Sequence, residues 1–155
     1  MESGSDALRR TSQAAQRICA LNGIGPITAS AIVVSVGHPR DFRNGRQIAA
    51  WAGLVPRQSS SGGKERLGTI TKRGDTYLRG LLTQGARSTL NAALSRAPEK
   101  RSRLEHWIVE LHRRAGYHKT LVAIANKHAR ICWAMLAHEE SYDPQSWQRH
   151  APKAA

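Results

Sequence analysis

The chain has 155 residues, 24 Lys and Arg against 11 Asp and Glu, a net charge of +13 and a pI near 11.0. This length fits one domain with a modest core, and a positive field of this size attracts polyanions. No apolar run approaches membrane-spanning length and no signal-peptide pattern follows Met1, so we expect no membrane partner and a cytoplasmic protein. Cys19 and Cys132 lack metal-site spacing and are too few for a disulfide framework, although one bonded pair stays open.

Apolar spacing and helix breakers predict a chain that is mostly helical. The expected helices span residues 6–21, 26–36, 44 or 45–51, 75–97, 99–115 and 118–139. Pro26 suits a first helical turn, Asp75 is expected as an N-cap, and Pro98 and Gly116 end helices. Residues 53–74 are rich in glycine and read as an irregular Gly/Ser loop, with a short extended piece at 67–70. We therefore predict an all-α domain over 1–140 and a flexible tail over 141–155.

The helical spacing also predicts which residues face the core. The apolar points of the first helix are Ala7, Leu8, Ala14, Ala15 and Ile18. The inward residues are expected to be Leu78, Leu81, Leu82, Gly85, Thr89 and Ala93 in the long helix, Leu104, Trp107, Ile108 and Leu111 in the next, and Leu121, Ile124, Ala125, His128, Ile131, Cys132 and Met135 in the last. His128 is expected to be a hydrogen-bonded core histidine. The other histidines lack the pairing of a metal site, so we expect no metal ligands in this chain.

The first motif is the sequence LNGIGPITASAI over residues 21–32. It resembles the helix-hairpin-helix element of DNA-repair and recombination proteins, in which a Gly-Ile-Gly turn lets the backbone approach a phosphate. Gly23, Gly25 and Thr28 would then contact the DNA backbone rather than its bases. The plainer alternative is an ordinary tight turn between two helices.

The second motif combines hydroxyls, glycines and cations over residues 54–79. Three serines, Ser59, Ser60 and Ser61, directly precede a glycine pair. The cations that follow are Lys64, Lys72, Arg73 and Arg79. Glycines permit unusual backbone shapes, and clustered cations neutralise a phosphoryl group under attack. The alternative is a surface loop with solvated charges.

Charge along the sequence is uneven, and it gathers around the second motif. Basic residues from Arg40 to Arg96 are opposed there only by Asp41, Glu65 and Asp75. The middle third should therefore build an electropositive face, with the Gly-Ile-Gly turn near its edge. No helix with base-reading residues stands out, so binding should depend little on sequence.

The two motifs, taken in order, resemble the C-terminal domain of the DEDD-type, bridge-RNA-guided insertion-sequence transposases, the IS one-ten and one-sixteen family. The resemblance extends over residues 18–136. It follows Gly-Ile-Gly-Pro, Phe42, Leu54-Val55-Pro56, Ser-Gly-Gly-Lys, Lys72-Arg73-Gly74 and Tyr77-Leu78-Arg79. The family implies DNA transposition and recombination, DNA and a guide RNA as partners, and a prokaryotic, nucleoid-associated protein.

The resemblance also implies roles for single residues. The serine before the glycine pair, here Ser61, would attack a DNA phosphate and hold it as a transient phosphoserine link. Ser60 is the next candidate for the nucleophile and Ser59 the third. Lys64, Lys72, Arg73 and Arg79 would hold the target phosphate. These roles come from the family rather than from the spacing alone.

Full-length members of this family carry an N-terminal RuvC-like domain whose acidic residues bind magnesium. The first forty residues here hold only Glu2 and Asp6 and cannot supply that set. We therefore expect a fragment, a member of a homo-oligomer in its full-length form, that binds DNA weakly and does not recombine it alone. The alternatives are a non-catalytic helix-hairpin-helix DNA-binding module of a repair or competence protein, and a folded remnant without a role.

Overall fold

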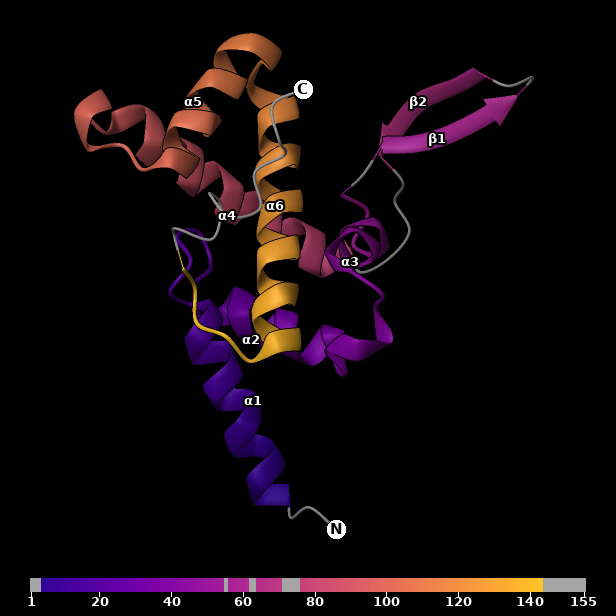
Figure 1. Cartoon of the computed structure of the whole chain (residues 1–155), viewed down its shortest axis with the longest axis vertical. Helices are drawn as coiled ribbons and strands as arrows, with labels where there is room; N and C mark the ends of the chain where they lie inside the picture. Colours follow the sequence, from indigo (N-terminus) through magenta and orange to yellow (C-terminus); the bar gives the residue numbers. More distant parts are fainter. Residues whose placement is uncertain (1–3, 55, 62–63, 71–75, 144–155) are drawn as a thin grey trace.

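The computed structural model describes residues 4–54, 56–61, 64–70 and 76–143, without the side chains of Leu8 and of the two strands. The elements in chain order are α1 (Gly4–Ile18), α2 (Pro26–Val36), the 3-10 turn η1 (Pro39–Asp41), α3 (Gly45–Trp51), β1 (Pro56–Ser61), β2 (Lys64–Ile70), α4 (Thr76–Ser95), the 3-10 turn η2 (Pro98–Lys100), α5 (Arg103–Ala115) and α6 (Tyr117–His138). Figure 1 shows α6 running through the middle of the helical body.

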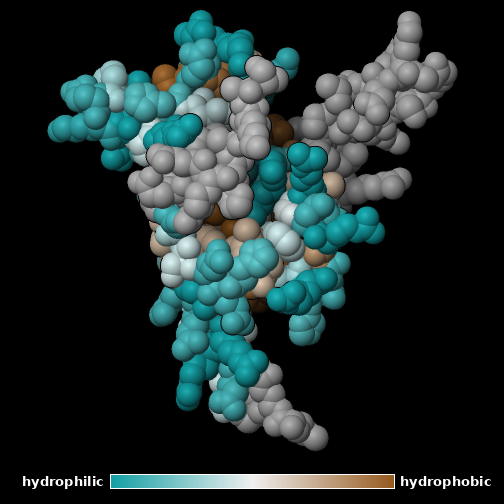
Figure 2. All heavy atoms as spheres, in the orientation of Figure 1, coloured by the Kyte–Doolittle hydropathy of each residue, from teal (hydrophilic) through white to brown (hydrophobic). Residues whose placement is uncertain are grey.

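The predicted all-α class is confirmed, because the elements that pack around the core are helices. Helix α6 contacts α1, α3, α4 and α5, so it serves as the central element of the domain. Its buried stripe includes Ile124, His128 and Cys132, as its helical spacing predicts. The facing stripe of α4 includes Leu82, Ala86 and Leu90, each fully enclosed. The first half of α1 extends away from this body and is hydrophilic on its visible side (Figures 1 and 2).

Helix bounds follow the local signals closely where caps are strong. Helices α2 and α3 begin and end as predicted, and the Asn44 side chain caps α3 by accepting a hydrogen bond of 3.0 Å from the Gln47 N–H. Helix α1 ends at Ile18 rather than at residue 21. Helix α5 begins at residue 103 rather than 99, because residues 98–100 form a 3-10 turn and the Ser102 hydroxyl caps the helix. Asp75, the expected cap of α4, lies outside the described residues.

The structure corrects the prediction of an irregular Gly/Ser loop. Residues 56–61 and 64–70 are not irregular but form an antiparallel hairpin, β1 and β2, which projects away from the helical body (Figure 1). The extended piece expected at 67–70 lies within β2. At the other end, Tyr142 packs against the core, and residues 144–155 of the predicted tail lie outside the described residues.

The turn before α2 crosses α4 with their backbones in direct contact. Gly23 has φ +93°, and a Cβ on Gly85 would collide with the Gly23 carbonyl oxygen. The Thr89 hydroxyl lies 3.2 Å from the Asn22 carbonyl oxygen and 2.9 Å from that of Gly85, so it bridges the two backbones. Both glycines are therefore required by close packing, and Gly23 also by its left-handed backbone.

Two glycines of α4 form a matched pair for testing this crossing. Gly85→Ala should destabilise the domain by roughly 1–3 kcal/mol, because two packed backbones must move apart. Gly80→Ala, where an added Cβ meets nothing within 4 Å, should gain up to about 1 kcal/mol from helix propensity. Urea unfolding followed by circular dichroism measures both. Equal stability of the two variants would contradict the crossing.

Candidate nucleic-acid interface

Strand register determines how the three serines are arranged in the hairpin. Ser61 pairs with Lys64, Ser60 with Glu65, and Ser59 with Arg66. The register therefore places Ser59 and Ser61 opposite cationic residues and Ser60 opposite an acidic one. The residues between Ser61 and Lys64 lie outside the described part.

The base of the hairpin is fixed to the helical body at Leu54. Its carbonyl oxygen accepts a hydrogen bond of 3.0 Å from the Asn126 side-chain amide on α6, and its N–H donates to the Ala49 carbonyl oxygen at 2.9 Å. The Leu54 side chain is buried in the core. The chain therefore leaves the body for β1 from a point held by both α3 and α6.

Of the cations predicted around the serines, Arg79 can be located with its side chain. It is half-buried in the first turns of α4, and its Nη1 atom is enclosed without a hydrogen-bond partner in the described part of the chain. An enclosed guanidinium nitrogen without a partner carries a desolvation cost that an anion would offset. Lys64 is in β2, whereas Lys72 and Arg73 lie outside the described residues.

The two glycines of the Gly-Ile-Gly turn have different structural roles. Gly23 packs on α4, as described above, and faces the protein. Gly25 is exposed, with open space where a Cβ would stand, and it is the N-cap residue of α2. Thr28 has its side chain buried, so only its backbone N–H, in the first helical turn, is suited to meet an anion.

Helix α6 contributes cations that sequence reasoning assigned no role. Lys127 lies with its Nζ 4.8 Å from the ring centre of Trp107, and Arg130 packs on Gly45 at the start of α3. Burial, and secondarily the charge of Arg130, lower the pKa of Lys127 from 10.5 to about 8. Their spacing of three residues, beside the apolar stripe of α6, was the available signal that they share one side of the helix.

His128 lies directly beneath the Gly-Ile-Gly turn. It is buried as predicted, but the expected hydrogen bond is wrong: neither ring nitrogen has a partner among the described residues. An added Cβ on Gly23 would lie 3.0 Å from the His128 Cε1 atom. Burial lowers the pKa of His128 from 6.5 to about 4, so the ring is neutral at physiological pH.

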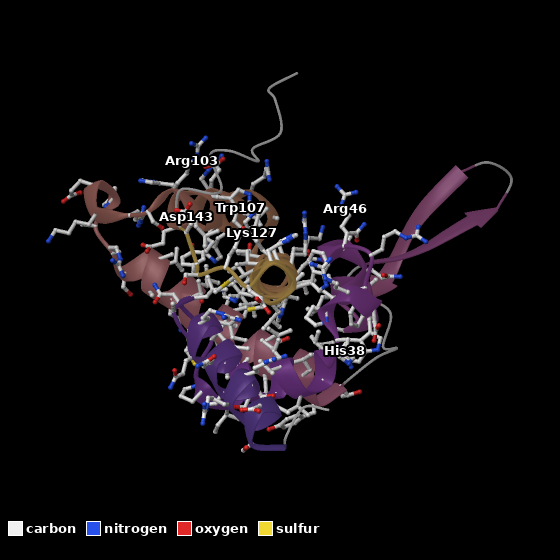
Figure 3. The ribbon with its side chains drawn as sticks, turned by 60° about the horizontal axis from the view of Figure 1, so that its bottom comes forward. His38, Arg46, Arg103, Trp107, Lys127 and Asp143 are labelled. Carbon is white, nitrogen blue, oxygen red and sulfur yellow. The ribbon has the colours of Figure 1, made fainter. Side chains whose placement is uncertain are left out.

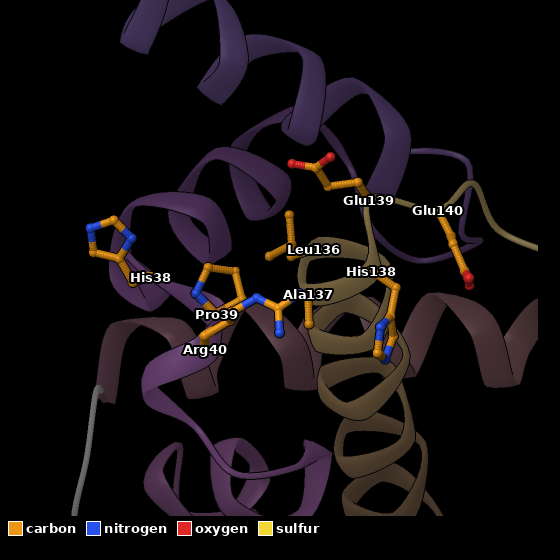
Figure 4. Close-up of a pocket in the computed structure, with 8 residues that line it drawn as sticks. All are labelled: His38, Pro39, Arg40, Leu136, Ala137, His138, Glu139 and Glu140. Atoms are coloured by element: carbon orange, nitrogen blue, oxygen red, sulfur yellow. The ribbon is translucent and has the colours of Figure 1, made fainter. Parts of the chain in front are cut away.

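The other candidate sites offer fewer groups suited to binding a ligand or to catalysis. A cavity of about 560 Å³ lies between η1 and the end of α6 (Figure 4). Its lining mixes His38, Arg40 and His138 with Glu139 and Glu140, so it favours neither sign of charge. In the described ranges, no three His, Cys, Asp or Glu side chains gather as a metal site requires, and no helix combines the length and apolarity needed to cross a membrane. The thiols of Cys19 and Cys132 are free.

Comparisons with known proteins assign the class. Residues 15–102 match the family described as "Transposase IS116/IS110/IS902 family". A probable family 20 transposase of Pseudomonas aeruginosa is 53% identical over 129 residues, which are 83% of this chain and 37% of that protein. The transposase for insertion sequence element IS1111A of Coxiella burnetii is 41% identical over 136 residues, 88% of this chain and 36% of its own length. A putative transposase of Sinorhizobium fredii, y4pF/y4sB, is 39% identical over 135 residues, 87% of this chain and 34% of that protein.

These matches define a helical domain of insertion-sequence transposases. The chain belongs to the IS116/IS110/IS902 transposase family. It spans only about a third of the length of the curated relatives described above.

The buried His128 should make stability depend on acid. In the unfolded chain this residue becomes protonated below about pH 6.5. In the folded chain it becomes protonated only near pH 4, so between these values the unfolded state binds more protons. Stability from this group is therefore complete above pH 6.5 and is lost as the pH falls toward 4, by up to roughly 3 kcal/mol.

The measurement compares urea unfolding of the wild type and His128→Leu at several pH values. The difference between their free energies of unfolding isolates the effect of His128, because every other ionisable group is present in both proteins. A difference that stays constant between pH 7 and pH 4 would rule out the buried neutral ring.

Proposed function

We propose that this chain is the DNA-binding, serine-bearing domain of an insertion-sequence transposase, acting in DNA recombination through a transient phosphoserine link. The observation that carries the proposal is the combination of family membership with the serine–cation register of the hairpin. A serine oxygen that attacks phosphorus needs positive charge nearby to stabilise the negative charge that builds on the phosphoryl oxygens. The register pairs Ser61 with Lys64, which supports this chemistry.

The register also favours one serine over its neighbours. Ser60 pairs in register with Glu65, whose negative charge would disfavour a phosphate. Ser59 pairs with a cation, Arg66, but it lies two residues farther from the end of the strand. Ser61 is therefore the proposed nucleophile, with Ser60 the alternative that the triple serine leaves to experiment.

Phosphate binding would draw on cations and backbone from separate elements. Lys64, Lys72, Arg73 and Arg79 are the proposed side-chain contacts. The enclosed Nη1 of Arg79 supports its part, since it lacks a partner in the described chain. Gly25 and the first-turn N–H groups of α2 are proposed as backbone contacts in the manner of a helix-hairpin-helix element, whereas Gly23 packs inward.

The remaining chemistry would come from the longer transposase. The relatives are almost three times as long as their matched regions, which leaves room for the RuvC-like domain whose acidic residues would bind magnesium. A guide RNA and a homo-oligomer belong to the same proposal. A non-catalytic helix-hairpin-helix module is the second candidate, and the serine–cation register is what counts against it.

Binding to duplex DNA should fall steeply with salt. Neutralised phosphates release counterions, and each contact adds about 0.9 to the slope of log affinity against log salt concentration. Fluorescence anisotropy with unrelated duplexes at several salt concentrations measures the slope, and similar affinities are expected for all sequences. Salt-independent binding, or a strong preference for one sequence, would count against the proposal.

Ser61→Ala should abolish the covalent protein–DNA adduct and leave DNA binding nearly intact. The assay supplies the acidic domain of a full-length relative, guide RNA and DNA, and detects the adduct on denaturing gels. Ser60→Ala is the matched control and should retain the adduct. The reverse pattern would move the nucleophile by one residue, and an adduct that survives replacement of Ser59, Ser60 and Ser61 together would refute the serine mechanism.

A further inference from the structure

Four cations from three helices form a surface apart from the hairpin serines. We call this the α6 basic surface, and its members are Arg46 of α3, Arg103 of α5, and Lys127 and Arg130 of α6. Figure 3 shows Arg46, Lys127 and Arg103 on the same side of the molecule, with Lys127 between the other two. Arg46 and Arg103 are exposed and Lys127 is half-buried. Asp143 is the acidic residue labelled near Trp107 in that view.

Packing between α3 and α6 places Arg130 against the residue that precedes Arg46. An added Cβ on Gly45 would lie 3.1 Å from the Arg130 Cβ and 3.2 Å from its Cα, so the start of α3 rests on this part of α6. Arg46 follows Gly45 directly, and Arg130 is itself exposed. Neighbouring positive charges oppose one another, and this cost is recovered when an anion binds between them.

The contact between Lys127 and Trp107 restricts what the surface can recognise. The Lys127 ammonium covers one face of the indole at 4.8 Å, which is a cation–π contact. A nucleobase that stacked on that face would have to displace the ammonium. The arrangement therefore suits a phosphate, which meets the charge, better than a base, which needs the ring.

The α6 basic surface lies next to the base of the hairpin. Asn126, which precedes Lys127, holds the Leu54 carbonyl oxygen from which the chain departs toward β1. The surface thus borders the base of the hairpin. We propose that the α6 basic surface binds the phosphodiester backbone of a nucleic acid, on the stretch that flanks the phosphate engaged by the hairpin. This inference rests on the proposed function and adds a second binding site to it.

An acidic protein segment is the competing occupant, and the surface suits it less well. Protein interfaces are anchored by buried aromatic and apolar side chains at their centre. The large exposed apolar side chains of the described chain are Ile27, Val34, Tyr77, Leu94 and Tyr117. None of these residues belongs to α3 or to the part of α6 that carries Lys127 and Arg130. A repeating phosphate chain requires only the charges.

The test compares two variants that each lose two positive charges. Lys127→Gln with Arg130→Gln should weaken binding of a short duplex DNA about tenfold at low salt and reduce the salt slope by about two. Arg113→Gln with Arg114→Gln, at the end of α5, is the control and should change the slope by much less. A second pair, Arg46→Gln with Arg103→Gln, alters exposed residues only and serves if the first pair fails to fold. Circular dichroism checks the fold of each.

The outcomes separate this inference from the proposed function. Steep, salt-dependent wild-type binding, with both surface pairs behaving like the control on duplex DNA and on duplex RNA alike, overturns the α6 basic surface and leaves the proposed function standing. Absence of wild-type binding overturns both. The same titration with duplex RNA identifies the source of the phosphates: a loss confined to RNA supports the surface with RNA as its partner, and a loss with DNA supports it with DNA.

Discussion

The contact between two glycine backbones is the constraint on which the rest of this domain depends. Gly23 and Gly85 bring the turn before α2 against α4, and the Thr89 hydroxyl lies within hydrogen-bonding distance of both backbones. His128 of α6 lies beneath the same point. One small region therefore holds the α1–α2 pair, α4 and α6 in register with each other. The same region fixes the relative position of the start of α2 and the start of α4, which carry proposed phosphate contacts.

The sequence predicts the helices well because their signals are local. Pro26 and Asn44 act through their own turns, and an apolar stripe at helical spacing has one way to be buried. The hairpin was not predicted, because the polar, glycine-rich segment shows no alternation of apolar and polar residues. Its strands become visible only through their pairing. The packing of Gly23 on α4 was likewise not predicted, because its crossing partner, Gly85, lies 62 positions away along the chain.

The location of the positive charge could likewise be predicted only in part from the sequence. Counting cations along the chain indicates residues 40–96 as the electropositive region, and part of the candidate interface does fall there. Lys127 and Arg130 escape that count, because only the packing of α3 on α6 brings them beside Arg46. His128 was correctly assigned to the core from its stripe, yet its lack of hydrogen bonds depends on neighbours from other elements. Local pattern therefore determines which residues are buried, and tertiary packing determines what each of them meets.

The bulge at the base of the hairpin has a consequence for how the chain tolerates changes of length. Pro56 pairs with Ile70 and Gln58 with Leu67, so two steps along β1 match three along β2. The extra residue is absorbed there, and the pairing of Ser61 with Lys64 beyond it stays regular. A one-residue slip beyond the bulge would exchange the faces of the serines, whereas the base already accommodates an odd residue. An insertion or deletion at the foot of the hairpin is therefore expected to disturb the pairing of Ser61 with Lys64 less than one near its tip.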